Sequence, residues 1–369
     1  MELVCFTHLP WDFVYQRPQH LLSRFAKQYR VYYFEEPRDT EEDDHFAAGI
    51  TKENIAVVKL FLAKKEGDRN ARLTHLVHNA FKYLGIQDYI CWYYTPMALQ
   101  FTRTLTPRSV VYDCMDELSQ FRFAPAELLS LEEELMEKAD VVFTGGHRLY
   151  EAKKHRHPNI HPFPSSIDFD HFAQARSEQA AEVDDGQIGF PRLGFFGVVD
   201  ERFDVDLLRN MAASRPDWHF VIIGPVVKID PAILPQAENI HYLGQRSYDE
   251  LPQYINSWDI ALMPFAINES TEFISPTKTP EYLAAGKPVI STAIHDVVRP
   301  YGTEGLVHIA DTAEEFIACA EKEMAKSDRS EWLTKVDSFL AGNSWDRTTD
   351  QMSAIISDAV TSKKMLANV

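Results

Sequence analysis

Short runs of apolar residues alternate with longer segments in which apolar residues recur every three or four positions, nearly throughout the chain. The short runs predict buried strands and the longer segments predict amphipathic helices, the pattern of βαβ units on parallel sheets. The segment "RPQHLLSRFAKQY" predicts a helix, with Pro18 suited to its first turn. In the first half of the chain we expect strands near residues 2–6, 30–34, 55–59, 89–94, 109–113, 140–144 and 160–163.

The alternation of short apolar runs with amphipathic segments is interrupted once and then restarts. Residues 174–190, "QARSEQAAEVDDGQIGF", are polar and acidic with few large apolar side chains, which indicates a linker. Beyond it, strands are predicted in "RLGFFG", "HFVIIG", "IHYLG", "DIALMPF", "PVIST" and "GLVHIA". We therefore expect an α/β protein with two Rossmann-like open parallel-sheet domains that face a cleft. The expected divisions are a first domain at 1–175, a linker at 176–190, a second domain at 191–344, and a C-terminal helix at 345–369 that can return to the first domain.

Composition and charge narrow the class of partner. The chain carries 37 basic and 55 acidic residues, a net charge of −18, which argues against a nucleic-acid binder. No apolar stretch approaches the roughly 18 residues of a membrane span. Met1 is followed at once by a strand pattern, and the cysteines are scattered without a Cys-x-x-Cys pair, so we expect a cytoplasmic protein with at most peripheral contact at the inner membrane face.

One segment, "SPTKTPEYLAAGKPVIST" at 275–292, combines a helix start with charged side chains. Thr279 before Pro280, or Ser275 before Pro276 one turn earlier, can begin the helix. Either choice puts Lys278 near an end that already carries partial positive charge, which suits a bound phosphate and is otherwise unfavourable. Glu281, one turn along, can accept hydrogen bonds from two vicinal hydroxyls. The alternatives are a solvated Lys278 and a Glu281 that only complements the helix dipole.

These residues resemble the donor-binding helix of the retaining GT-B glycosyltransferases of family four, and the resemblance extends to "DIALMPF" and "RLGFFGVVDER". Within that family, the sequence is most similar to teichuronic-acid-type enzymes of cell-surface polysaccharide biosynthesis. The resemblance covers both domains, although the specific motifs lie in the second. It implies a GT-B fold and transfer from a nucleoside-diphosphate sugar.

The resemblance also implies roles for individual residues of the second domain. Arg202 and Lys278 match the two basic residues that grip the donor diphosphate, and Glu281 matches the glutamate that holds the ribose. Gln245 and Arg246, after "HYLG", are candidates to contact the base, with a plain surface charge as the alternative for Arg246.

The sequence departs from the family pattern at two places. The glutamate expected eight positions before Glu281 is replaced by Phe273, so Glu272 serves through a re-spaced loop or that donor-sugar contact is missing. In "VVYDCMDEL", Met115 stands where related sequences have a histidine that touches the sugar. Asp116 or Glu117 can take the place of that histidine, or the donor sugar lacks the hydroxyl that the histidine would bind. We name Asp116 and Glu272 as candidate catalytic residues, with capping of the following helix as the alternative for the two acids after Met115.

The first loop, "THLPWDFVYQRPQHL", is bulky and polar-aromatic where a glycine-rich turn is common. It suggests an acceptor surface in which Trp11 stacks on a sugar while Gln16 and Arg17 reach hydroxyls or a phosphate. The alternative for Trp11 is a place in the core.

Together these observations predict a glycosyltransferase that moves a UDP-linked sugar to a glycan or lipid-linked acceptor. We expect no metal, because fixed positive charges at the diphosphate can stabilise the leaving group and no histidine cluster has zinc spacing. We expect no cofactor, and the absence of a P-loop and of a G-x-G-x-x-G motif argues against a kinase or a classical dehydrogenase. Two alternatives stay open. One is a nucleotide-sugar epimerase of the same fold, which would need a catalytic acid–base set at the cleft. The other is a non-catalytic nucleotide-sugar-binding protein, which the replacement of the histidine by Met115 keeps open.

Overall fold

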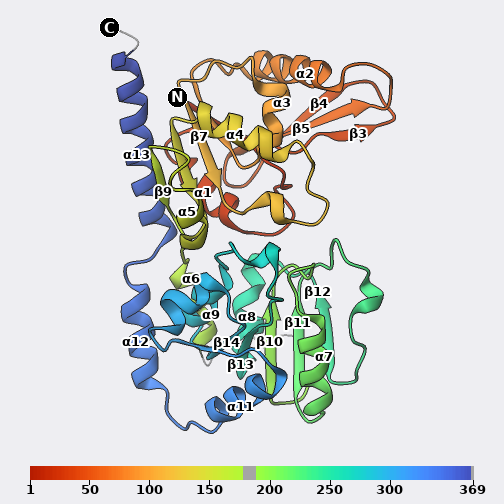
Figure 1. Ribbon diagram of the computed structural model, residues 1–369, viewed down its shortest axis with the longest axis vertical. Coiled ribbons are helices and arrows are strands. Elements are labelled where there is room, and N and C mark those ends of the chain that lie inside the picture. Colours follow the sequence, from red (N-terminus) through yellow and green to blue (C-terminus); the bar gives the residue numbers. More distant parts are fainter. Residues whose placement is uncertain (178–187, 367–369) are drawn as a thin grey trace. The chain divides into compact units, whose positions relative to one another are not determined.

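The computed structural model describes residues 1–177 and 188–366, and the chain forms two compact units. The first unit comprises Met1–Ser119, Phe123–Pro164 and the chain from Asp346 onward. The second comprises Gln120–Arg122 and Ser165–Trp345. Figure 1 colours the chain in sequence order and labels the elements of both units.

The first unit is built on a sheet whose central strands are parallel and almost wholly buried. The order of its main path is β3-β5-β2-β1-β6-β7-β8-β9, and β4 pairs antiparallel with β5. Every residue of "YICWY" in β6 is buried, as expected for strands covered on both faces. The strands are β1 (Glu2–Phe6), β2 (Arg30–Phe34), β3 (Arg38–Thr40), β4 (His45–Ile50), β5 (Ile55–Ala63), β6 (Tyr89–Tyr93), β7 (Ser109–Cys114), β8 (Val141–Thr144) and β9 (Ile160–Pro162).

The helices of the first unit begin and end where local chemistry allows. Asp68 caps the longest of the connecting helices by accepting bonds from the N–H groups of Asn70 and Ala71, and Gly85 ends it with φ +70°. The helices are α1 (Arg17–Phe25), α2 (Arg69–Leu84), α3 (Leu99–Thr102), α4 (Leu128–Lys138), α5 (His147–Lys153) and α13 (Trp345–Leu366), with single 3₁₀ turns at Pro96–Ala98 and Leu118–Gln120.

The last helix, α13, is drawn in blue with the first unit in Figure 1. An ion pair joins Arg24 of α1 to Asp346 at the start of α13, and another joins Lys363 to Asp140. Met352 and Ile356 of this helix are buried. The C-terminal segment therefore completes the core of the first unit.

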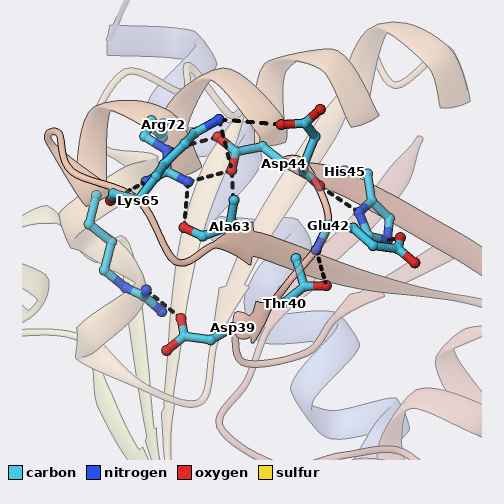
Figure 2. Close-up of polar contacts among 10 residues, drawn as sticks. Asp39, Thr40, Glu42, Asp44, His45, Ala63, Lys65 and Arg72 are labelled. Atoms are coloured by element: carbon cyan, nitrogen blue, oxygen red, sulfur yellow. Dashed lines mark hydrogen bonds and ion pairs between the residues drawn. The ribbon is translucent and has the colours of Figure 1, made fainter.

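Strands β3 and β4 were not expected from the sequence, because residues 35–50 carry no clear apolar alternation. Ion pairs, rather than a local apolar pattern, connect this segment to α2 (Figure 2). Arg72 binds Asp44 through two nitrogens, one of them Nε at 2.8 Å from Oδ2, and Arg69 binds Asp39 at 2.6 Å. These contacts link residues that are far apart in sequence, so no local pattern could indicate them.

The second unit holds a six-stranded sheet in the order β12-β11-β10-β13-β14-β15, and all of its pairings are parallel. The chain runs from β10 outward to β12 and then returns to β13 on the other side of β10. Ligands of open α/β sheets bind at such a reversal, beyond the carboxyl ends of the strands. The strands are β10 (Arg192–Phe196), β11 (His219–Ile223), β12 (Ile240–Gly244), β13 (Ile260–Met263), β14 (Val289–Ser291) and β15 (Val307–Ile309).

Helices connect these strands and cover the sheet. They are α6 (Phe169–Ala173), α7 (Val205–Ser214), α8 (Leu251–Asn256), α9 (Lys278–Ala284), α10 (His295–Val297), α11 (Ala313–Met324) and α12 (Ser330–Leu340), with short 3₁₀ turns at Gln174–Arg176, Pro231–Ile233, Tyr248–Glu250 and Glu269–Thr271 and a π-helical turn at Val298–Gly302. Within the described ranges, no helix is both long and apolar enough to cross a bilayer.

The first boundary between the units differs from the expected one. It lies at Pro164, whereas the sequence pattern suggested 175. The reason is α6, whose Phe172 is fully buried and stacks on Phe196 of β10 at a ring distance of 6.2 Å. Most of the predicted linker, residues 178–187, lies outside the described residues.

Candidate functional site

The loop after β13 leads into α9, which begins at Lys278 directly after Thr277. This start lies between the two alternatives that the sequence offered. The Nζ atom of Lys278 lies 3.4 Å from the Thr277 hydroxyl oxygen and 5.8 Å from the ring centre of Phe196. A Cβ built on Gly197 would lie 3.0 Å from the Lys278 Cε atom, so the lysine side chain crosses the loop that follows β10. The fold thus joins two segments that are separate in the sequence.

Glu281 lies one turn into α9 and is only 4% exposed. Thr277 donates a side-chain hydrogen bond to the carboxyl group, but Oε2 has no hydrogen-bond partner among the described residues. Burial raises the pKa of Glu281 to about 7; Lys278 and the Thr277 bond oppose this shift, and Asp168 adds to it. Burying a carboxyl oxygen without a hydrogen-bond donor costs free energy. Such an oxygen is expected at a site where a bound ligand supplies the donor.

Two glycines allow close packing of the loops beyond β10 and β11. Gly197 has φ +150° and Gly224 has φ +141°, both in the region that favours glycine. A Cβ on Gly224 would lie 1.8 Å from the carbonyl oxygen of Gly197. The N–H of Phe196 donates to the Tyr282 hydroxyl at 2.9 Å, which ties the end of β10 to α9. Backbone at the carboxyl end of β10 therefore lies next to Lys278, and the Phe195 ring closes the other side, with its Cζ atom 3.0 Å from the Cβ position of Gly197.

Arg202 follows in the same loop and is half-buried. Its Nε and Nη2 donate to the carboxylate of Asp200, the latter at 2.7 Å, and Asp200 is itself buried. The Arg202 guanidinium also lies 5.3 Å from the ring centre of Phe121. Asp200 thus fixes the direction of the arginine side chain.

Of the other second-unit candidates, Gln245 and Glu272 are exposed and Arg246 is half-buried. Gln245, just after β12, is exposed. Arg246 donates from Nε to the Tyr254 hydroxyl at 2.6 Å, so it is a packed side chain rather than a free surface charge. Glu272 is exposed and ends the 3₁₀ turn at Glu269–Thr271.

The first-loop candidates lie mostly inside the first unit. Trp11 is 8% exposed and packs edge-to-face on Tyr33 at 5.1 Å, which is the core alternative. Arg17 is 4% exposed and donates to Asp113 through Nε and Nη2 and to the Phe163 carbonyl through Nη1. These placements argue against direct acceptor contact by Trp11 and Arg17. Gln16 is half-buried at the start of α1, where its N–H donates to the side chain of Gln19.

Burial alone would lower the pKa of Arg17, but the charge and hydrogen bonds of Asp113 raise it above its ordinary value. The guanidinium therefore remains charged, and it joins the first loop to the ends of β7 and β9. Sequence reasoning missed this pair, because nothing near Arg17 in the chain indicates Asp113 as its partner.

Met115 and Asp116 lie half-buried in the loop after β7. The N–H of Gly145 donates to the Cys114 carbonyl at 2.8 Å, and a Cβ on Gly145 would lie 2.3 Å from the Met115 carbonyl oxygen. A glycine at 145 is thus needed where this segment packs against the backbone of Met115. Among the residues that the structure describes, no group of three or more His, Cys, Asp or Glu side chains is arranged to hold a metal ion.

Comparison with known proteins gives matches on both sequence and structure. Residues 191–325 match the family model described as "Glycosyl transferases group 1". A curated relative from Bacillus subtilis (strain 168), TuaH, named for glycosyl transfer in teichuronic acid biosynthesis, is 24% identical over 257 residues, and the match spans 64% of this chain and 64% of the relative's length.

Two solved structures share this fold over nearly the whole chain. Sucrose-phosphate synthase from Thermosynechococcus elongatus has a TM-score of 0.70 at 14% identity, covering 98% of this chain and 99% of that one. Anabaena HepE in complex with UDP and glucose has a TM-score of 0.72 at 14% identity, covering 97% and 99%. The chain has the GT-B fold, with two parallel-sheet α/β domains, as the sequence analysis predicted.

Proposed function

We propose that this chain is a glycosyltransferase that takes a sugar from a nucleoside-diphosphate sugar, UDP-linked, and transfers it to a glycan or lipid-linked acceptor. The family model over the second unit and the description of the curated relative support transfer rather than epimerisation. HepE was solved with UDP and glucose, which supports a UDP sugar as the donor. The observation that carries the proposal is the joint placement of Lys278 over Gly197 and of the unpartnered Glu281 oxygen one turn away.

In this mechanism the second unit binds the nucleotide and stabilises its departure. Lys278 and Arg202 neutralise the charge that grows on the diphosphate as its bond to the sugar breaks, a task that needs fixed positive charges in place before the reaction. Glu281 accepts the ribose hydroxyls. Retention of configuration and independence from a metal belong to the proposal, as do Asp116 and Glu272 as groups near the sugar and Gln245 and Arg246 as groups near the base.

Changing Lys278 to alanine should weaken UDP binding about 10- to 100-fold, the usual range for one lost charge-assisted hydrogen bond. The measurement is the rise in melting temperature with UDP concentration, since a ligand stabilises the fold by mass action. Lys322→Ala is the matched control, because Lys322 is an exposed lysine on α11 of the same unit. Equal UDP shifts in both variants would contradict the donor-site assignment.

UDP binding should strengthen as the pH rises from about 6 to 8. The pKa of Glu281 is about 7 without ligand, and accepting hydroxyl donors favours the ionised form, so binding releases a proton near that pH. In the Glu281→Gln variant, the part of the pH dependence that comes from Glu281 should vanish, and only the part that comes from the titration of UDP itself should remain. Calorimetry in two buffers of different ionisation enthalpy measures the released proton. The same proton release from Glu281→Gln as from the unchanged chain would argue against this role.

The raised pKa also affects the protein without ligand. The folded state holds a proton on Glu281 that the unfolded state loses, so stability falls as the pH rises from the ordinary glutamate pKa of about 4.5 toward about 7. The cost of an ionised, unpaired Glu281 is therefore largest at the pH where a nucleotide would relieve it.

A further inference from the structure

Strand β4, labelled in Figure 1, forms an open edge of the sheet in the first unit. It pairs antiparallel with β5 and with no other strand of the described chain, and residues 47–50 are exposed. An open edge can pair with another chain unless charged side chains, proline or a bulge prevents it. The sequence of β4, "HFAAGI", contains no lysine, acidic residue or proline, and its register with β5 is continuous. This edge therefore lacks the usual protection against pairing.

The backbone groups on the outer side of β4 belong to alternate residues. The N–H of Thr51, directly after the strand, donates to the carbonyl of Ile55 at 3.0 Å, so the odd-numbered residues of β4 bond to β5. In an antiparallel ladder, such hydrogen-bonded pairs alternate with pairs whose backbone groups point away from the partner strand. The N–H and C=O groups of Phe46, Ala48 and Ile50 therefore point to the open edge.

A second copy of this chain can meet that edge with the same three residues. Two-fold symmetry makes the two contacting surfaces identical, and antiparallel β4 strands satisfy it when Ala48 lies opposite its own counterpart. Phe46 of each copy then lies opposite Ile50 of the other, so all three outward residues are used. The ladder pattern gives about six new backbone hydrogen bonds in this register.

Apolar side chains at the same edge fit this register. Phe46, Ala48 and Ile50 occupy alternate positions, so their side chains lie on one face of the sheet. The Phe46 ring contacts the ring of Tyr83 on α2, with 5.6 Å between ring centres, and Tyr83 is 77% exposed. Ile50 is 70% exposed. In the dimer, Ile50 of the second copy would lie directly opposite Phe46, and both would lose contact with water.

The charges at the two ends of β4 are opposite in sign. Residues 41–44, before the strand, are Glu-Glu-Asp-Asp, and Lys52 follows the strand. Lys65 lies 3.8 Å from Asp43 and Glu53 lies 3.9 Å from Lys52, yet the Asp43 side chain is fully exposed and that of Lys52 is 79% exposed. Antiparallel pairing brings the lysine of each copy beside the acidic segment of the other. Parallel pairing would place the two acidic segments side by side.

We propose that two copies of this chain associate through antiparallel β4 strands, which joins the sheets of their first units. The proposal goes beyond the proposed function and does not depend on it, because β4 contains none of the donor-site residues. A contact built on one six-residue strand is small compared with a standard protein interface. We therefore expect weak association, with a Kd of roughly 10 to 100 µM.

Sedimentation equilibrium of the full chain, from concentrations well below that Kd to well above it, should show monomer and dimer in equilibrium. Ala48→Glu should weaken association at least about 10-fold, because two carboxylates would lie opposite each other on the symmetry axis. Ala47→Glu is the matched control, since it adds the same charge at an exposed neighbour that lies opposite Lys59 of its own chain. Lys52→Glu should weaken association about 3- to 10-fold, because an exposed opposite-charge contact is lost at both ends of the strand.

Hydrogen exchange on the unchanged chain is the second readout, and it decides the matter even if Ala48→Glu does not fold. The backbone of β4 should exchange more slowly at high than at low protein concentration. The proposal is overturned if the chain stays monomeric, if it forms open-ended aggregates, or if Ala48→Glu dimerises as tightly as Ala47→Glu. A dimer without protection of β4 would also overturn it. The UDP melting shift is measured separately, so a monomeric chain that still responds to UDP would contradict this proposal alone.

Discussion

Replacing Arg17 with methionine is expected to lower the free energy of unfolding by about 3 to 5 kcal/mol, because it leaves a buried carboxylate without its partner. Asp113 is fully buried and accepts from two nitrogens of Arg17, at 2.8 Å for Nη2. The Phe163 carbonyl, 2.7 Å from Nη1, would lose its donor as well. Denaturant unfolding of the variant without any ligand measures the loss.

The control is Arg24→Met on the same helix. Arg24 pairs with Asp346, whose side chain is 62% exposed, so water can solvate the carboxylate that is left behind and the expected loss is smaller than for Arg17→Met. A double variant, Arg17→Met with Asp113→Leu, should recover much of the loss because no charge is left buried. If Arg17→Met kept full stability and lost only acceptor binding, the role predicted from the sequence would be right and the structural role wrong.

Replacing Gly194 with alanine is expected to destabilise the second unit by about 3 kcal/mol or more. Gly194 lies in the middle of β10, and a Cβ there would lie 2.0 Å from Cδ2 of Trp258. Trp258 is 2% exposed and packs against Tyr282, so the ring has no free space to enter. Thermal unfolding followed by calorimetry checks the loss.

Gly49→Ala is the matched control, since Gly49 is also a strand glycine but has nothing within 4 Å of its Cβ position. It should change stability by less than about 0.5 kcal/mol. Combining Gly194→Ala with Trp258→Leu should cost less than the sum of the two single changes, because the smaller side chain removes the overlap. Additive costs would show that the Trp258 ring is not the obstacle.

Much of the fold could be predicted because its strands are buried on both faces. Runs such as "YICWY" and "IALM" are apolar without interruption, and they form the strands β6 and β13. The edge strands β3 and β4 were missed because their sequence shows no clear apolar alternation, while their pairing with β5 and the ion pair of Asp44 with Arg72 join residues that are distant in the sequence. The boundary between the two units lies before the expected position for a similar reason. The burial of Phe172 depends on its contact with Phe196, which is far away in the sequence.

The candidate donor site could be predicted in part because two of its residues are close together in the sequence. Lys278 and Glu281 lie one turn apart, so a short segment contains the relevant spacing. The contributions of Gly197, Gly224 and Asp168 come from other loops and appear only when the sheet brings them together. For the first loop, side-chain chemistry suggested contact with a ligand at Trp11 and Arg17, whereas the structure uses both inside the unit.

The return of α13 to the first unit bears on how this protein can be divided for study. A fragment that ends before Asp346 would lose the helix carrying Met352 and Ile356, and it would present their apolar binding surface to water. Truncation at that point should therefore yield an aggregation-prone product even if every catalytic side chain is retained. An isolated first unit would instead need the terminal helix spliced on after Pro164, with the intervening half of the chain excised.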